Sequence, residues 1–179
     1  MILTALAAAA VAATPAPAAA TVAECIWSKL PPYRETVLAA PDFETFDRLR
    51  RDYPAEATAT AFEACVPEGQ NDAAAETSFT YYEASLWAHR RLSVKWPAAA
   101  LATIDAIPDE KLQYFWLQPA GEQQTPAWRQ ARAEAWTRVY EPFGRTRPAA
   151  ERDDLEIFII GRVGWRLGEI DYRQGLARR

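Results

Sequence analysis

Alanine dominates this sequence, and proline rather than glycine divides it into segments. The 179 residues include 37 alanines and 13 prolines but only seven glycines. Alanine has the highest helix propensity, and proline ends one helix or opens the next because it lacks a backbone N–H and fixes φ. We therefore expect an all-α fold, a single irregular bundle of about six to eight helices stabilised by one disulfide and preceded by a cleaved signal peptide.

Apolar residues recur at three- and four-residue spacing between the prolines, which predicts where the helices lie. The longest helix is expected over 73–92, after the polar turn 67–72, with Asn71 or Asp72 as its N-cap. Other helices are expected over 23–30, continuing or restarting across Pro31-Pro32 to Leu38, and over 42–51, 55–66, 97–107, 108–117 and 126–139.

The last segment, 151–174, fits two secondary structures, and the choice concerns residues 157–172. A β-favouring run at 157–160 and alternation over 163–167 favour a hairpin, whereas apolar residues also form a helical stripe. Three glycines, at 161, 164 and 168, would lie on one side of a helix and let another backbone approach closely. We predict a helix, because a lone hairpin would have no other strand to pair with.

An uncharged apolar run opens the chain and resembles a secretory signal peptide. Residues 1–13 are followed by small residues in the A-x-A arrangement that signal peptidase accepts, which places cleavage near residue 20 or 23. We therefore expect a signal peptide at 1–23 and one helical domain at 24–179, in the periplasm or secreted. Glu24 breaks the small-residue pattern that precedes a lipidated cysteine, and no other run is long enough for a transmembrane segment.

Two cysteines, Cys25 and Cys65, are expected to form a disulfide in an oxidising compartment. Their spacing is unlike the C-x-x-C of redox-active thiols. The bond would close a loop of about forty residues and contribute about 4 kcal/mol to stability.

The composition argues against several classes of function. A single histidine excludes multi-histidine zinc sites within this chain, and no nucleophile-elbow, P-loop or EF-hand motif is present. A net charge of −4 argues against a general nucleic-acid binder. We expect no metal and no cofactor.

Three side chains of the long helix are candidate catalytic residues. Glu83 is flanked by aromatic residues that would raise its pKa and suit it to act as a general acid. Ser85 and His89 are four residues apart, at the spacing of a hydroxyl and its base on one helix face. The competing interpretations are a solvated Glu83 near Arg90 and a His89 that complements the helix dipole.

Two groups of arginines are candidates for charge recognition. Arg145 and Arg147, with Arg152 following, are a candidate anion-binding cluster or simply solvated turn residues. Arg162 and Arg166 lie in the apolar last segment and need partners, for which Glu169 and Asp171 are the nearest carboxylates in the sequence.

These patterns favour an exported, non-enzymatic helical protein of the bacterial envelope that acts by binding an unknown protein or small molecule. One alternative is a cell-wall glycan hydrolase with Glu83 as general acid. The other is an anion-binding protein that uses the arginines at 145, 147 and 152.

Overall fold

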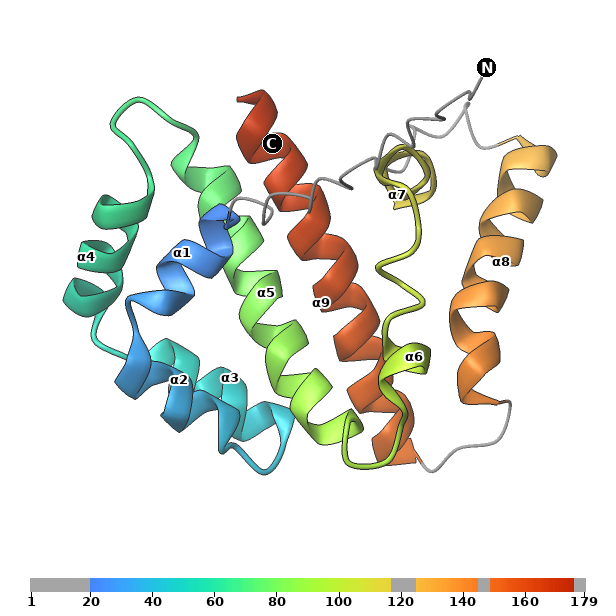
Figure 1. Ribbon diagram of the computed structural model, residues 1–179, viewed down its shortest axis with the longest axis horizontal. Coiled ribbons are helices and arrows are strands. Elements are labelled where there is room, and N and C mark those ends of the chain that lie inside the picture. Colours follow the sequence, from blue (N-terminus) through green and yellow to red (C-terminus); the bar gives the residue numbers. More distant parts are fainter. Residues whose placement is uncertain (1–19, 117–124, 145–148, 176–179) are drawn as a thin grey trace, which may run out of the picture.

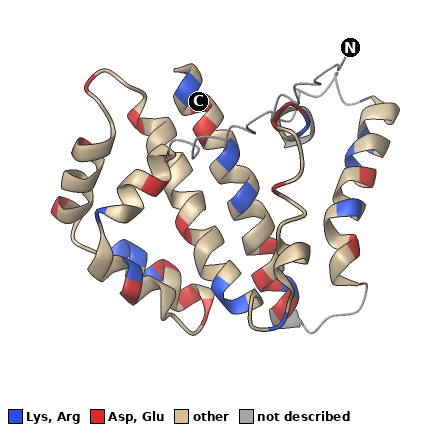
Figure 2. Ribbon diagram, viewed as in Figure 1, with Lys and Arg blue, Asp and Glu red and all other residues tan. Residues whose placement is uncertain are grey.

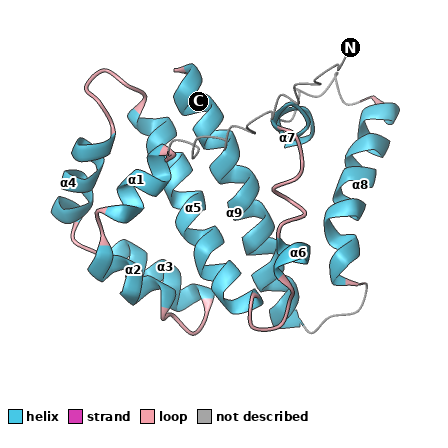
Figure 3. Cartoon of the chain, viewed as in Figure 1, coloured by secondary structure: helices cyan, strands magenta, loops and turns pink. Residues whose placement is uncertain are grey.

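The computed structural model describes residues 20–116, 125–144 and 149–175, and within these ranges every regular element is helical (Figure 3). The all-α prediction is therefore confirmed for the described residues. The helices, labelled in Figure 1, are α1 (Val22–Ser28), α2 (Pro31–Leu38), α3 (Phe43–Asp52), α4 (Ala55–Cys65), α5 (Asp72–Leu92), α6 (Ala98–Leu101), α7 (Asp109–Trp116), α8 (Pro126–Tyr140) and α9 (Ala149–Gln174), with the 3-10 helix η2 (Glu141–Phe143) after α8.

The long helices α5 and α9 run antiparallel through the middle of the molecule (Figure 1). Glycines make their close approach feasible: a Cβ on Gly161 would lie 2.8 Å from the backbone nitrogen of Ser85, and one on Gly168 would lie 2.7 Å from the Cα of Ser78. Real Cβ atoms do not come so close, so these positions depend on glycine. The helix predicted over 157–172 is confirmed, and its glycine face packs against a backbone as expected.

Helices α1 to α4 cover α5 on the side away from α6 to α8 (Figure 1). Ile26 and Val37 are fully buried there, as is Phe46 of α3. The sulfur atoms of Cys25 in α1 and Cys65 at the end of α4 lie 2.11 Å apart, so the predicted pairing is confirmed by a disulfide-length contact.

At two places the structure defines helix boundaries that the sequence left open or placed wrongly. The chain restarts after Leu30 rather than continuing, because a residue before proline is driven out of helical geometry. The helix expected over 97–107 is wrong beyond Leu101: residues 102–107 form turns. Arg166 of α9 donates to the carbonyls of Ile104 and Ile107, and the carbonyl of Ile104 also accepts from the backbone N–H of Ile107 within the turn.

Helices α6 to α8 occupy the other side of α9 (Figure 1). Leu112 of α7 and Trp128 and Val139 of α8 are buried. The rings of Trp96 and Phe143 meet edge to face, with centroids 5.2 Å apart. None of the described helices has a stretch of sufficient length and hydropathy to span a membrane.

Candidate functional site

Glu83 is the most deeply buried carboxyl group among the described residues. It lies on α5, on a face turned away from α9, where α2 and α3 cover it, and only 1% of the residue is exposed. The hydroxyl of Tyr33 donates a hydrogen bond to Glu83. The Nε of Arg50 lies 3.6 Å from Oε1 of the same carboxyl group. The competing interpretation, a solvated Glu83 near Arg90, is therefore wrong: Glu83 is buried, and its partners are Tyr33 and Arg50.

Burial raises the pKa of Glu83 to about 7, even though the hydrogen bond from Tyr33 and the charge of Arg50 both lower it. Burial also raises the pKa of Tyr33, and the neighbouring Glu83 raises it further. The carboxyl group is thus divided between its acid and anionic forms near neutral pH. Such a group can donate a proton, accept one, or ionise when a cation approaches.

A pocket of about 400 Å³ lies between α4 and α5, and Glu83, Tyr33 and Arg50 form one end of its wall. Phe62 and Phe79 contribute aromatic surface, and small residues of α4 line the rest of that side. From the first turns of α5 the lining also receives Thr80 and two exposed carboxylates, those of Asp72 and Glu76.

Ser85 and His89 do not join Glu83 in this site. Ser85 is buried against Gly161 of α9, and its hydroxyl donates to the carbonyl of Tyr82 at 2.7 Å. His89 is exposed, and its ring centroid lies 5.8 Å from that of Phe158. Burial, followed by the charge of Arg162, lowers the pKa of His89.

The predicted arginine cluster is only partly described. Arg145 and Arg147 lie outside the described residues, and Arg152 is exposed near the start of α9. The suggested partners of the two later arginines are wrong. Arg162 binds Asp105 with two hydrogen bonds, of 2.9 and 2.7 Å, and Arg166 binds Asp109 and the carbonyls before it. Basic positions along α9 therefore secure the segment between α6 and α7 (Figure 2).

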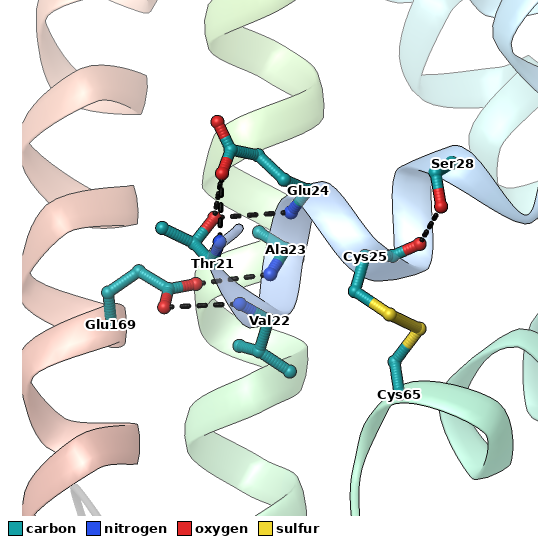
Figure 4. The surroundings of a disulfide bond; sticks show 8 residues. All are labelled: Thr21, Val22, Ala23, Glu24, Cys25, Ser28, Cys65 and Glu169. Atoms are coloured by element: carbon teal, nitrogen blue, oxygen red, sulfur yellow. Dashed lines mark hydrogen bonds between the residues drawn. A yellow bond between two sulfur atoms is a disulfide. The ribbon is translucent and has the colours of Figure 1, made fainter. Parts of the chain in front are cut away.

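A second buried carboxyl group, Glu169, was not foreseen as a functional residue. It is 5% exposed and accepts hydrogen bonds from the backbone N–H groups of Val22 and Ala23, at 3.3 and 3.1 Å (Figure 4). The hydroxyl of Ser78 also donates to it, at 2.6 Å. Glu169 thus joins α1, α5 and α9. In the sequence, only the position of Glu169 beside the apolar stripe of the last helix indicated that this side chain could be buried.

Tyr33 and Arg50 were also missed, because they come from helices 50 and 33 residues before Glu83 and no local spacing links them. Among the described residues no group of histidine, cysteine, aspartate and glutamate side chains is placed to hold a metal ion. Comparison with protein-family models, with curated proteins and with solved structures finds no match for this chain.

Proposed function

We propose that this is an exported helical protein that binds a small organic cation in the pocket between α4 and α5. The signal-like segment at 1–13 and the disulfide-length contact support export. The observation that carries the binding function is the position of Glu83. It is a buried carboxyl group with a raised pKa, and it lies in the wall of a pocket.

The size of the pocket indicates a small molecule. A volume of about 400 Å³ lies within the usual range of small-molecule pockets. The rings of Phe62 and Phe79 favour an apolar or aromatic body in the ligand.

The charges of the lining indicate a positive group on that ligand. Three carboxyl groups, those of Asp72, Glu76 and Glu83, line the pocket together with one guanidinium group, that of Arg50. Arg50 also binds Asp47 at 3.0 Å, so its charge is shared with a carboxylate outside the pocket. A buried carboxylate is costly unless its charge is compensated, and a ligand ammonium would supply this compensation.

The test is a set of three probes of similar shape: benzylamine, benzyl alcohol and benzoate. We expect ligand-observed NMR to show saturable binding of benzylamine at least tenfold tighter than benzyl alcohol, and no binding of benzoate. Glu83→Gln should abolish the preference for the amine, whereas Glu63→Gln, an exposed position on α4 outside the lining, should retain it. Equal binding of all three probes, or an unchanged preference in Glu83→Gln, would contradict the proposal.

Binding of the amine should also depend on pH with a defined sign. A cation favours the ionised form of Glu83, so binding releases a proton when the carboxyl group is protonated. With a pKa of about 7, the affinity should fall as pH drops below 7, approaching tenfold for each pH unit, and level off above it. Isothermal titration in buffers of different ionisation enthalpy would measure the proton released.

A second candidate is hydrolysis of cell-wall glycan with Glu83 as general acid. The observation that favours it is the same raised pKa, which leaves a protonated carboxyl group available near neutral pH. The expected result is release of soluble fragments from purified peptidoglycan by the wild type and by Glu63→Gln, but not by a folded Glu83→Gln. Absence of release by the wild type would remove this candidate and leave the binding proposal intact.

A further inference from the structure

The first residues of α1 are built into the core of the molecule. Val22 is 6% exposed and Ala23 is completely buried. Their backbone N–H groups donate to the buried carboxylate of Glu169 (Figure 4). The hydroxyl of Ser78 also donates to this carboxylate. Removing Val22 and Ala23 would therefore expose apolar surface and leave Glu169 without two of its three hydrogen-bond donors.

Thr21, the residue before α1, forms a complete capping box with Glu24. Its hydroxyl accepts from the backbone N–H of Glu24 at 3.3 Å, and its own backbone N–H donates to Oε2 of Glu24 at 2.8 Å. Loss of a helix cap of this kind is destabilising. Ala20, by contrast, is exposed and has no part in the capping box.

Several positions satisfy the small-residue rule of signal peptidase, among them a cut after Ala18, and two of these positions lie directly beside the start of α1. Cleavage after Ala20 has Ala18 and Ala20 before the cut, and cleavage after Ala23 has Thr21 and Ala23. The first cut leaves the contacts of α1 complete. The second removes the cap and both buried residues.

We infer that the export signal is removed between Ala20 and Thr21, so that the mature chain begins at Thr21. Hydrolysis adds water across that peptide bond: the oxygen goes to the new carboxylate of Ala20, and the nitrogen of Thr21 becomes an ammonium group after taking up protons. This nitrogen lies 2.8 Å from the carboxylate of Glu24, so cleavage converts a hydrogen bond from a neutral amide into an ion pair with an ammonium group. The inference rests on the proposed export and is independent of the pocket and its ligand.

The experiment is intact-mass and N-terminal analysis of the full-length chain exported by a Gram-negative bacterial host. We expect a mature protein that starts at Thr21. A start at Ala19 or at Glu24, or a folded and exported protein that retains its first twenty residues, would overturn the inference.

Two chains produced without a signal, one starting at Thr21 and one at Glu24, provide the second test. Because the shorter chain lacks the cap and two buried residues, its midpoint of thermal unfolding should be lower by about 10 °C. Equal midpoints would show that the contacts of Val22 and Ala23 do not matter and would overturn the structural basis of the inference.

A third measurement follows the new amino group itself. In the mature protein the carboxylate of Glu24 should raise the pKa of the Thr21 α-amino group above its ordinary value, because it stabilises the ammonium form. Glu24→Gln should lower this pKa, and Glu63→Gln should leave it unchanged, as measured by NMR after reductive methylation with ¹³C-formaldehyde. An identical α-amino pKa in wild type and Glu24→Gln would contradict the ion pair.

Discussion

The two sides of α9 are held by different kinds of interaction. On the side of α5 and α1, glycines allow backbones to touch, Glu169 binds the first N–H groups of α1, and the contact between Cys25 and Cys65 closes the amino-terminal helices. On the side of α6 to α8, Arg162 and Arg166 bind carboxylates and carbonyls of the 102–109 segment. The first set is buried and insensitive to salt, whereas the second is partly exposed and open to screening.

Buried contacts of this kind suit the support of a rigid site. The pocket of Glu83 lies on the side of α1 to α5, among elements fixed by buried contacts. Precise placement of a buried carboxyl group needs such support. We expect the segment between α6 and α7 to open locally at a lower free energy, because partly exposed charged contacts hold it in addition to the buried side chain of Ile104.

Loss of the disulfide, which lies only on the side of α1 to α5, should change the free energy of unfolding the most. Replacing both Cys25 and Cys65 by serine should lower the free energy of unfolding by about 4 kcal/mol, because a cross-link across 40 residues restricts the unfolded chain. Urea unfolding with and without reductant measures this effect. Wild type with reductant should match the double variant, and a loss below about 1 kcal/mol would contradict the role assigned to this bond.

The second effect concerns Glu83 and has a sign that depends on pH. The folded state raises the pKa of this carboxyl group from 4.5 to about 7, so the folded protein binds its proton more tightly than the unfolded chain does. Stability is therefore lost as pH rises from about 4.5 to about 7, by about 3 kcal/mol, and then stays level. Glu83→Gln should lack this loss.

Glu63→Gln is the control for that experiment, because Glu63 is exposed on α4 and lies outside the lining of the pocket. Its stability should follow the wild type at every pH. If the difference in unfolding free energy between wild type and Glu83→Gln is the same at pH 4 and pH 8, the buried carboxyl group does not titrate as argued.

The third effect tests the contact between α5 and α9. Helix propensity alone predicts that Gly168→Ala stabilises the protein by about 1 kcal/mol. The added Cβ, however, would lie 2.7 Å from the Cα of Ser78. Relieving this clash requires the backbone of α5 or α9 to shift, which costs free energy. We expect a net loss of about 2 kcal/mol. Glu156→Ala, at an exposed position of the same helix, should have little effect, and a gain in Gly168→Ala would show that the helices can separate.

Local patterns in the sequence were sufficient to predict much of this fold. Alanine-rich stretches between prolines located the helices, and the spacing of the glycines at 161, 164 and 168 indicated the face of α9 that meets another backbone. Two cysteines in a chain with a signal-like start indicated their pairing. Each of these inferences depends on spacing within one segment or on a count.

The parts that escaped prediction depend on which segments meet. Apolar periodicity identified one buried face of α5 but not the second, where Glu83 lies beneath α2 and α3. Nearest carboxylates in the sequence were chosen for Arg162 and Arg166, although the real partners are 57 residues away. The turns at 102–107 escaped prediction for the same reason, because the guanidinium group that binds the carbonyls of Ile104 and Ile107 belongs to Arg166, far along the chain.

The smallest global effect is expected on the other side of α9, from Arg166→Gln. Arg166 donates to the carbonyls of Ile104 and Ile107, at 3.0 and 2.6 Å, and to Asp109. Its loss should lower the global free energy of unfolding by about 1 kcal/mol. Hydrogen exchange should nevertheless become much faster in α7, while the central amides of α5 keep the protection set by global unfolding.

Salt provides an independent check of the same contrast. If charged contacts fasten the 102–109 segment, raising the ionic strength of the wild type should accelerate exchange in α7 and leave α1 unchanged, because the bonds to Glu169 are buried. In Arg166→Gln the salt dependence of α7 should shrink, since its main charged contact is already gone. Acceleration of α1 and α7 to the same extent would mean that the two sides of α9 open together, and the distinction between them would fail.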